Sequence, residues 1–222
     1  MAPRPASLDT RERLIQAAIR LFGEQGFAAT TTRMLAEDAG ANIGSIAYHF
    51  GHKRGLYLAA ARHIAEQLRG RLDLDAAAGA APFETRDDAL AALRALARRM
   101  VRTFAEDEAC RRWLLLVMRE QVQPGEAFEI LQAEAFGLVQ ATLGGLIARL
   151  TDRAIDDRRV ILETHTLIGQ IVFFLIGREP LLRRLGVTAF DAGLLADIEA
   201  VIEGHLARYA TPDGDPAPTP TP

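Results

Sequence analysis

Apolar residues recur every three or four positions along most of the chain, which is the spacing of one face of an α-helix. The first such run starts after Asp9 and Glu12, which have the spacing of a capping box. Its inward face is expected to comprise Leu14, Ala17, Ala18, Leu21 and Phe22. Long alternating runs rich in Val, Ile and Thr, which would predict strands, are absent from the sequence. The pattern therefore predicts an all-α fold.

The segment after this first helix contains glycines, an aromatic residue and a run of hydroxyls. Gly23 and Gly26 are expected to loosen and end the helix, and Phe27 to pack beneath the elements that follow. The three threonines at 30–32 can cap the next helix, bind phosphate or do both, and we expect both.

Two short helical patterns, separated by Gly40, occupy residues 31–50. Gly40 tolerates the positive φ that a tight turn between helices needs. The apolar stripe of the first helix comprises Met34, Leu35 and Ala39. Asn42 can cap the second helix, in which Ile46 and Phe50 share one face. The opposite face carries small and hydrogen-bonding residues, namely Gly44, Ser45, Ala47 and Tyr48, with His49 at its edge.

Such a face suits the major groove of DNA, because small residues allow close approach and polar tips reach phosphates and base edges. The pattern indicates a helix-turn-helix, although an ordinary helical hairpin would show a similar one. Two strings carry more detail: Thr-Thr-Thr-Arg-Met-Leu-Ala-Glu-Asp-Ala-Gly and Ile-Ala-Tyr-His-Phe-Gly-His-Lys-Arg-Gly-Leu-Tyr. Together they make residues 10–58 resemble the N-terminal domain of the TetR/AcrR family of transcriptional regulators.

The resemblance implies which side chains meet DNA. It places base or nearby sugar-phosphate contacts at Arg33, Ile43, Gly44 and Ser45. It places phosphate contacts at Thr32, Tyr48, His49 and Lys53, and the expected surface also includes Thr31, Asn42 and Ala47. Lys53 opens a helix, where a cation is unfavourable with the helix dipole, so phosphate contact is favoured over a solvated lysine. Many members have an aromatic residue in place of Ala47, so the operator cannot be taken from a relative.

Six further helical patterns cover the rest of the chain, at about 53–71, 86–105, 108–122, 127–151, 156–177 and 191–209. An Ala-rich stretch at 73–84 is expected to be a loop and the seam between domains. The predicted organisation, with about nine helices in all, is a flexible arm at 1–8, a three-helix DNA-binding domain at 9–53, a larger helical domain at 54–210 for effector binding and dimerisation, and a disordered tail at 211–222.

The helix at 108–122 contains Trp113 and is apolar nearly all round, which predicts deep burial. Arg119 and Glu120 follow in this apolar setting. They can be a surface pair, or they can hold the headgroup of a ligand.

The helix at 156–177 is also apolar on nearly every side and must be covered all round. The chain offers few helices to cover it, so we expect a second subunit to do so, with the helix at 191–209, in a four-helix interface. The expected interface residues are Leu167, Ile171, Phe174, Leu194, Ile198, Val201 and Ile202. The alternative is a monomer that buries both helices in its own core.

Residues 167–186, with 119–121 and 127–128, resemble the C-terminal domain of CecR-like regulators within the same family. The effector pocket is expected inside the helices at 86–177. Its candidate ligand contacts are Trp113, Arg119, Phe136, His165 and Phe173, with core packing as the alternative for each. Mostly apolar walls predict a small hydrophobic or aromatic effector.

Charge and cysteine content give further information on the class of protein. The net charge is −3, but residues 1–55 carry seven Lys and Arg against five Asp and Glu, so only this part suits phosphate. Cys110 is the single cysteine, for which a buried thiol is favoured over a reactive one. We expect no signal peptide, no apolar run of the roughly 18 residues that span a membrane, and a cytoplasmic protein.

The histidines at 49, 52, 63, 165 and 205 have no acidic or cysteine partners at metal-ligand or catalytic spacing. An enzyme, a metal site and a cofactor are therefore not expected. The sequence predicts a homodimeric repressor that binds a palindromic operator in double-stranded DNA and is released by a small-molecule effector. An activator, or a DNA binder without an effector, is the alternative.

Overall fold

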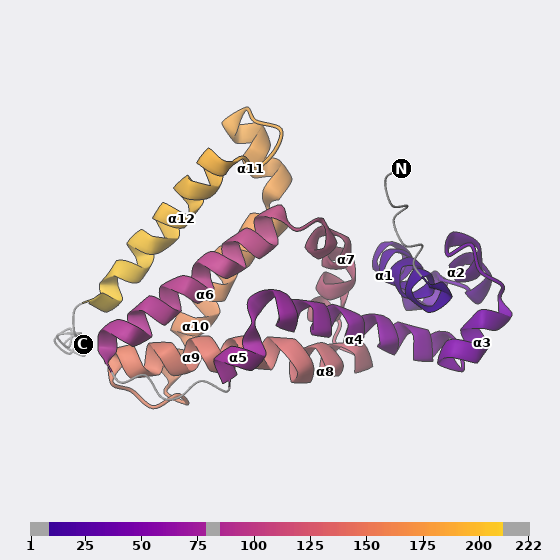
Figure 1. Ribbon diagram of the computed structural model, residues 1–222, viewed down its shortest axis with the longest axis horizontal. Helices are drawn as coiled ribbons and strands as arrows, with labels where there is room; N and C mark the ends of the chain where they lie inside the picture. The colour runs from indigo at the N-terminus through magenta and orange to yellow at the C-terminus, as the bar shows by residue number, and fades with distance from the viewer. Residues whose placement is uncertain (1–8, 79–84, 211–222) are drawn as a thin grey trace, which may run out of the picture. The chain divides into compact units, whose positions relative to one another are not determined.

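The computed structural model describes residues 9–78 and 85–210, and every regular element in that part of the chain is a helix (Figure 1). The chain forms two compact units. The first contains the residues up to Arg71 and Glu108–Gly137, and the second contains Leu72–Asp107 and the residues from Leu138 onward. The predicted boundary between residues 53 and 54 thus falls inside the first unit. The predicted arm at 1–8 and tail at 211–222 lie outside the described residues.

The first unit opens with helix α1, Thr10–Ala29. Asp9 caps it, because its carboxylate accepts the backbone N–H of Glu12 at 2.7 Å. The inward residues predicted from the sequence are all buried. Gly26 adopts a φ of 82° and kinks the helix near its end, as expected for a residue without a Cβ.

The other helices of this unit are α2, Thr32–Asp38; α3, Gly44–Phe50; α4, Lys53–Leu72; α7, Glu108–Val122; and α8, Glu126–Leu131. A π-helical stretch at Gln132–Phe136 follows α8. It lies inside the single helix predicted at 127–151, which the structure divides into α8, this stretch and α9, Gly137–Thr151.

Helix α7 packs along α1, but it is buried on one face only. Cys110, Trp113 and Leu116 are buried, whereas Leu115 is 53% exposed. The expectation of burial all round was therefore wrong, because α1 covers one side of the helix. Gly23 makes the close approach possible: a Cβ built at Gly23 would lie 3.1 Å from both Leu115 Cβ and the Leu116 backbone nitrogen.

Phe27 does not pack beneath the helix-turn-helix as expected. Its ring is 38% exposed and lies against Phe22 and Tyr57, with centroid distances of 5.7 and 5.2 Å. The kink at Gly26 changes the direction of the chain at this point, which takes Phe27 to the side where α1 meets α4.

The second unit contains α5, Leu74–Ala78; α6, Arg86–Glu106; most of α9; α10, Arg158–Ile176; α11, Arg178–Leu185; and α12, Ala192–Leu206, followed by a 3-10 turn at Ala207–Ala210. Two elements differ from the prediction. Residues 74–78 of the expected loop are helical, and α11 was not predicted; residues 79–84 of that loop lie outside the described residues.

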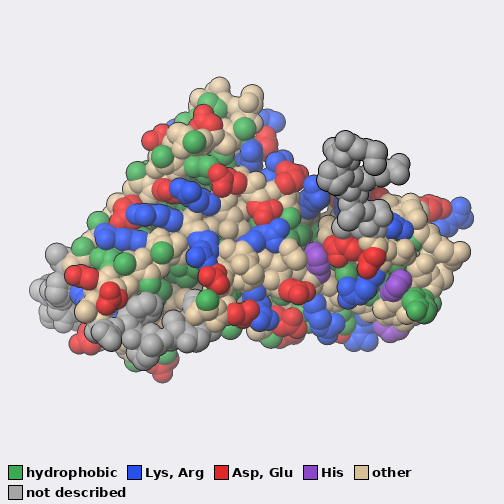
Figure 2. All heavy atoms as spheres, viewed as in Figure 1, with side chains coloured by type: hydrophobic (Ala, Val, Ile, Leu, Met, Phe, Trp, Pro, Cys, Tyr) green, Lys and Arg blue, Asp and Glu red, His purple; other side chains and the backbone are tan. Residues whose placement is uncertain are grey.

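Helix α6 is the centre of the second unit, because α10 and α12 both pack against it (Figure 1). The helix begins with a full capping box. The Thr85 hydroxyl accepts a hydrogen bond from the Asp88 N–H, and the Asp88 carboxylate accepts one from the Thr85 N–H. Ion pairs join its outer edge to α12, including Arg102 with Glu199 at 2.6 Å and Arg98 with Glu203 at 3.5 Å. Figure 2 shows basic and acidic side chains close together at the surface over α6 and α12.

Helices α10 and α12 each bury one face within their own unit and expose the other. Four residues predicted to form a dimer interface are buried within the chain: Leu167, Ile171, Ile198 and Ile202. Phe174 and Leu194 are partly exposed, and Val201 is 54% exposed. Within the chain α6 covers that side of both helices, so the burial of these four residues needs no second subunit, and their place in a dimer interface stays a prediction.

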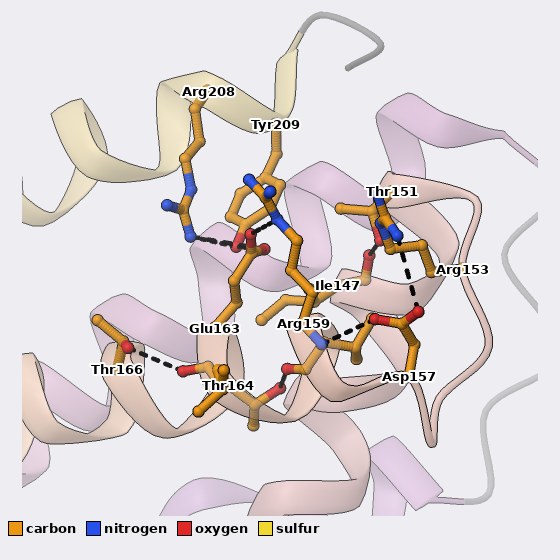
Figure 3. Close-up of polar contacts among 12 residues, drawn as sticks. Ile147, Thr151, Arg153, Asp157, Arg159, Glu163, Thr164, Thr166, Arg208 and Tyr209 are labelled. Atoms are coloured by element: carbon orange, nitrogen blue, oxygen red, sulfur yellow. Dashed lines mark hydrogen bonds and ion pairs between the residues drawn. The ribbon is translucent and has the colours of Figure 1, made fainter. Parts of the chain in front are cut away.

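A polar cluster ties the end of α12 to α10 (Figure 3). Glu163 accepts hydrogen bonds from the Tyr209 hydroxyl at 2.8 Å and from Arg159 Nε at 2.9 Å, and Arg208 lies at 3.6 Å. Burial by itself would raise the pKa of Glu163, but these hydrogen bonds and the arginine charges outweigh it and lower the pKa below the ordinary 4.5. Burial and the bond to Glu163 raise the pKa of Tyr209 to about 12, so its hydroxyl stays a donor.

Two helical stretches, Glu126–Thr151 and Arg158–Ile176, are long and apolar enough to cross a membrane by length and composition. The sequence expectation that no such run exists was wrong. In this structure the two stretches supply core residues such as Leu143 and Ile171, both fully buried. Core helices of water-soluble proteins meet the same criterion, so length and apolarity alone do not distinguish the two settings.

Replacing Gly23 by alanine is expected to destabilise the protein. Alanine favours helix by up to about 1 kcal/mol over glycine, but its Cβ would press on α7 backbone, and overpacking of this kind costs about 1–3 kcal/mol. We expect a lower unfolding free energy in urea. Gly70→Ala is the matched control, since Gly70 lies in α4 with open space around it and should be neutral or stabilising. Equal effects of both changes would contradict the close contact.

Glu163→Gln is expected to lower the unfolding free energy at pH 7 by about 1–2 kcal/mol, because it removes charged hydrogen bonds that are partly open to solvent. The pKa of Glu163 is lowered in the folded state, so its contribution is present above the unfolded value of 4.5 and is lost as the pH falls through the folded value. The difference from the unmodified protein should therefore shrink in acid. Glu66→Gln, at an exposed position of α4, is the matched control for the loss of a carboxylate, and equal effects of the two changes at pH 7 would contradict the role of the Glu163 cluster.

Candidate DNA-binding surface

Helices α2 and α3 form a helix-turn-helix with the turn that the sequence predicts. The Thr31 hydroxyl caps α2 by accepting the Met34 N–H at 3.2 Å, and Gly40 takes a φ of 56° in the turn. The Asn42 side chain accepts the Gly44 N–H at 2.8 Å. The helix-capping position is occupied by Ile43, one residue later than predicted, and makes no side-chain cap bond.

Helix α3 is anchored by one residue and open on the opposite face. Ile46 is only 2% exposed, and the guanidinium of Arg11 lies over the Phe50 ring at 5.6 Å. Tyr48 is 85% exposed and Ile43 is 53% exposed. The remaining predicted contacts are exposed or partly exposed: Thr31, Thr32, Arg33, Asn42, Gly44, Ser45, Ala47, His49 and Lys53. Figure 2 shows apolar and histidine side chains together at the surface of the α3 region.

Arg33, predicted to face bases, forms an exposed ion pair with Glu37 one turn along α2, at 2.7 Å. The hydrogen bond and charge of Glu37 raise the pKa of Arg33. The pair is exposed and therefore screened by solvent, so a phosphate or a base edge can compete for the guanidinium.

Lys53 has a structural role that the sequence reasoning missed. Its ammonium donates to the backbone carbonyls of Phe27 and Thr30, both at 2.8 Å, and lies 4.3 Å from the centre of the Phe27 ring. The Thr30 hydroxyl in turn donates to the carbonyl of Gly26 at 2.8 Å and is fully buried. Thr30 therefore points inward, so of the three threonines expected to serve capping and phosphate binding only Thr31 and Thr32 are open to solvent.

The kinked end of α1 is held from a second side by α7. Arg119 donates from Nε to the Gly23 carbonyl at 2.6 Å and from Nη2 to the Glu24 carbonyl at 2.9 Å. The kink at Gly26 interrupts the helical pairing of carbonyls near this point. A planar guanidinium can reach two such oxygens at once.

Glu120, the next residue, is 6% exposed and holds α4 and the start of α8. Its carboxylate accepts from the Tyr57 hydroxyl, from the Gly125 N–H at 3.2 Å and from the Phe128 N–H at 2.7 Å. Burial raises the pKa of Tyr57, and the hydrogen bond and charge of Glu120 raise it further, so the phenol remains a donor. Arg119 and Glu120 thus bind different helices rather than each other, and a role in ligand binding stays a prediction.

The residues predicted to contact a ligand are divided between the two units. Trp113 is 5% exposed and lies under the Arg71 guanidinium at 5.0 Å, and Phe136 is partly buried in the same unit. His165 and Phe173 belong to the second unit, on the open face of α10, where Phe173 is 67% exposed. In the described part of the chain, no group of three His, Cys, Asp or Glu side chains is placed to hold a metal ion.

The first unit contains a helix-turn-helix whose second helix, α3, exposes a polar face, and the rest of the chain is also helical. This combination defines a helix-turn-helix transcriptional regulator. Residues 14–60 match the model described as bacterial regulatory proteins, tetR family, and residues 89–211 match the CecR C-terminal domain. The HTH-type transcriptional dual regulator CecR of Shigella flexneri is 35% identical over 200 residues, which are 88% of this chain and 89% of that protein. The chain therefore belongs to the TetR family, with a C-terminal domain of the CecR type, and its relatives are transcriptional regulators rather than enzymes.

Solved structures show the same fold. One is described as AibR in complex with isovaleryl coenzyme A and operator DNA; it has a TM-score of 0.61 and 13% identity and covers 90% of this chain and 97% of that one. Another is the multidrug binding protein EbrR complexed with imidazole, with a TM-score of 0.52, 22% identity and coverage of 97% and 98%.

Proposed function

We propose that this chain is a cytoplasmic regulator that binds a palindromic operator as a homodimer and is released from it by a small effector. The exposed polar face of α3, set against the buried Ile46, is the observation that supports DNA binding most directly. On this proposal Arg33, Ile43, Gly44 and Ser45 meet bases or sugars. Thr32, Tyr48 and His49 meet phosphates. The Lys53 ammonium has three N–H donors, of which two bind backbone carbonyls, and the third would bind a phosphate.

The dimer is proposed on the open face of α10 rather than on the residues buried against α6. Ile161, Leu162, Phe173 and Ile176 are 41–67% exposed along this one helix. Val201 of α12 is exposed too. Small residues lie near it, with Ala200 directly before it and Gly204 about one turn further along the helix. Apolar side chains in such number on one face are typical of a protein–protein contact, and a two-fold axis would place two copies of the face together.

The effector is proposed to be small and hydrophobic or aromatic, because the helices at 86–177 offer mostly apolar walls. Two structures with the same fold hold small-molecule ligands, isovaleryl coenzyme A in one and imidazole in the other. Ligand binding would favour a spacing of the two heads that does not fit the operator, by no more than the difference in ligand affinity between the two states. A difference of about 3 kcal/mol would lower DNA affinity roughly a hundredfold. Repression is the primary proposal; the name dual regulator of the relative makes activation the second candidate.

Tyr48→Ala should weaken operator binding by about tenfold or more, because hydrogen bonds to charged groups contribute about 1.5–3 kcal/mol. Tyr48→Phe keeps the ring and removes only the hydroxyl, so it separates the phosphate bond from ring contact. Binding is measured by fluorescence anisotropy on an operator obtained by in vitro selection. Lys53 is not a suitable first target, because its loss would also release the end of α1. Unchanged affinity of both Tyr48 variants at moderate salt would refute the DNA surface.

Phe173→Glu should convert the dimer to monomers, because it places a charge at the most exposed apolar side chain of α10. Analytical ultracentrifugation over a range of concentrations measures the change. Val122→Glu is the matched control: Val122 is 73% exposed at the end of α7, so the charge should leave the dimer intact. A Phe173 variant that remains as dimeric as the control would rule out this face.

A further inference from the structure

We propose that a groove in the first unit binds an amphipathic anion, meaning a carboxylate or phosphate carried on a hydrocarbon chain. The groove has a volume of about 540 Å³ and is lined by residues of α1, the end of α2 and the first half of α7. This volume is within the range of small-molecule sites, about 300–1,000 Å³. It is a different place from the interior of the 86–177 helices, where the effector pocket was predicted.

Positive charge predominates around the groove. Four arginines line it, at 13, 20, 111 and 112, against two carboxylates, Glu24 and Asp38. Both carboxylates are paired with Arg20, so neither can neutralise the α7 side. Arg111 pairs with Glu108 of its own helix at 2.7 Å. Arg112 is exposed and has no ion-pair or hydrogen-bond partner among the described residues. An anion entering between α1 and α7 would therefore find a guanidinium that can form a bidentate bond.

The same groove offers a surface for an apolar tail. Leu115, one turn beyond Arg112 on α7, is 53% exposed and lines the groove, together with Ala17 and Ile19 of α1. A free inorganic anion would leave this apolar wall in water, and a neutral hydrocarbon would leave Arg112 unpaired. A molecule with both parts satisfies both, which is why we assign an amphipathic anion rather than either component alone.

The position of the groove suggests what its occupant would change. It runs along the contact of α1 with α7, beside the close approach at Gly23. Helix α1 carries the helix-turn-helix, so an occupant that shifts α7 along α1 alters how firmly the DNA-binding helices are held. This consequence for operator affinity rests on the proposed function, whereas binding in the groove does not.

The test is isothermal titration calorimetry on the full chain without DNA, below the micelle concentration of each probe. Decanoate and decyl phosphate are the anionic probes, and decanol and decyltrimethylammonium have the same tail with a neutral or cationic head. We expect one saturable site per chain for both anions and at least tenfold weaker binding of the other two. Binding of one anion only would narrow the head to carboxylate or phosphate. Equal binding of all four probes would overturn the proposal, because it would show that the arginines do not contribute.

Variants locate the site. Arg112→Gln should weaken the anions at least fivefold and leave decanol unchanged, and Leu115→Ser should weaken every probe. Arg149→Gln is the matched control, an exposed arginine of α9 in the second unit. If Arg112→Gln and Arg149→Gln bind the anions equally, the proposal is overturned. Operator affinity is then measured with decanoate present. Unchanged affinity would refute the coupling alone, and loss of operator binding without any probe would instead count against the proposed function.

Discussion

Two consecutive side chains of α7, Arg119 and Glu120, hold the first unit together by hydrogen bonds to other helices. Arg119 donates to two carbonyls at the kinked end of α1, and Glu120 accepts the hydroxyl of Tyr57 on α4 together with two N–H groups before and within α8. A buried carboxylate that lost these donors would pay a large desolvation cost. The interaction therefore fixes where α1 and α4 lie, and with them the short helices between.

The surface proposed for DNA depends on this support. Helix α3 has only seven residues and would not be stable alone in water. It keeps its orientation because Ile46 is buried and the helix packs against α1 and α2. Lys53 adds to the same support by tying α4 to the carbonyls of Phe27 and Thr30. Tyr48 can remain exposed because the opposite side of its helix supplies the packing.

The helices of the second unit are held together by apolar contacts in its core and by ion pairs and hydrogen bonds at its surface. Ion pairs join α6 to α12, and the Glu163 cluster fastens the end of α12 to α10. These polar contacts leave one face of α10 apolar and open, with Phe173 prominent on it. A helix with apolar side chains on two faces can pack against a different neighbour on each face. Here α6 covers one side, and the proposed second subunit would cover the other.

The sequence determined the helical fold, most helix ranges and the helix-turn-helix, because the apolar period, the caps at Asp9 and Thr31 and the turn glycine Gly40 act locally. It also determined the family, through motifs that are contiguous in the chain. Only the tertiary structure decided what Arg119, Glu120 and Lys53 bind, since their partners lie more than twenty residues away or on another helix. It likewise decided which side of α10 is covered. An apolar pattern states that a face avoids water, but not which neighbour covers it, because that depends on packing between distant segments.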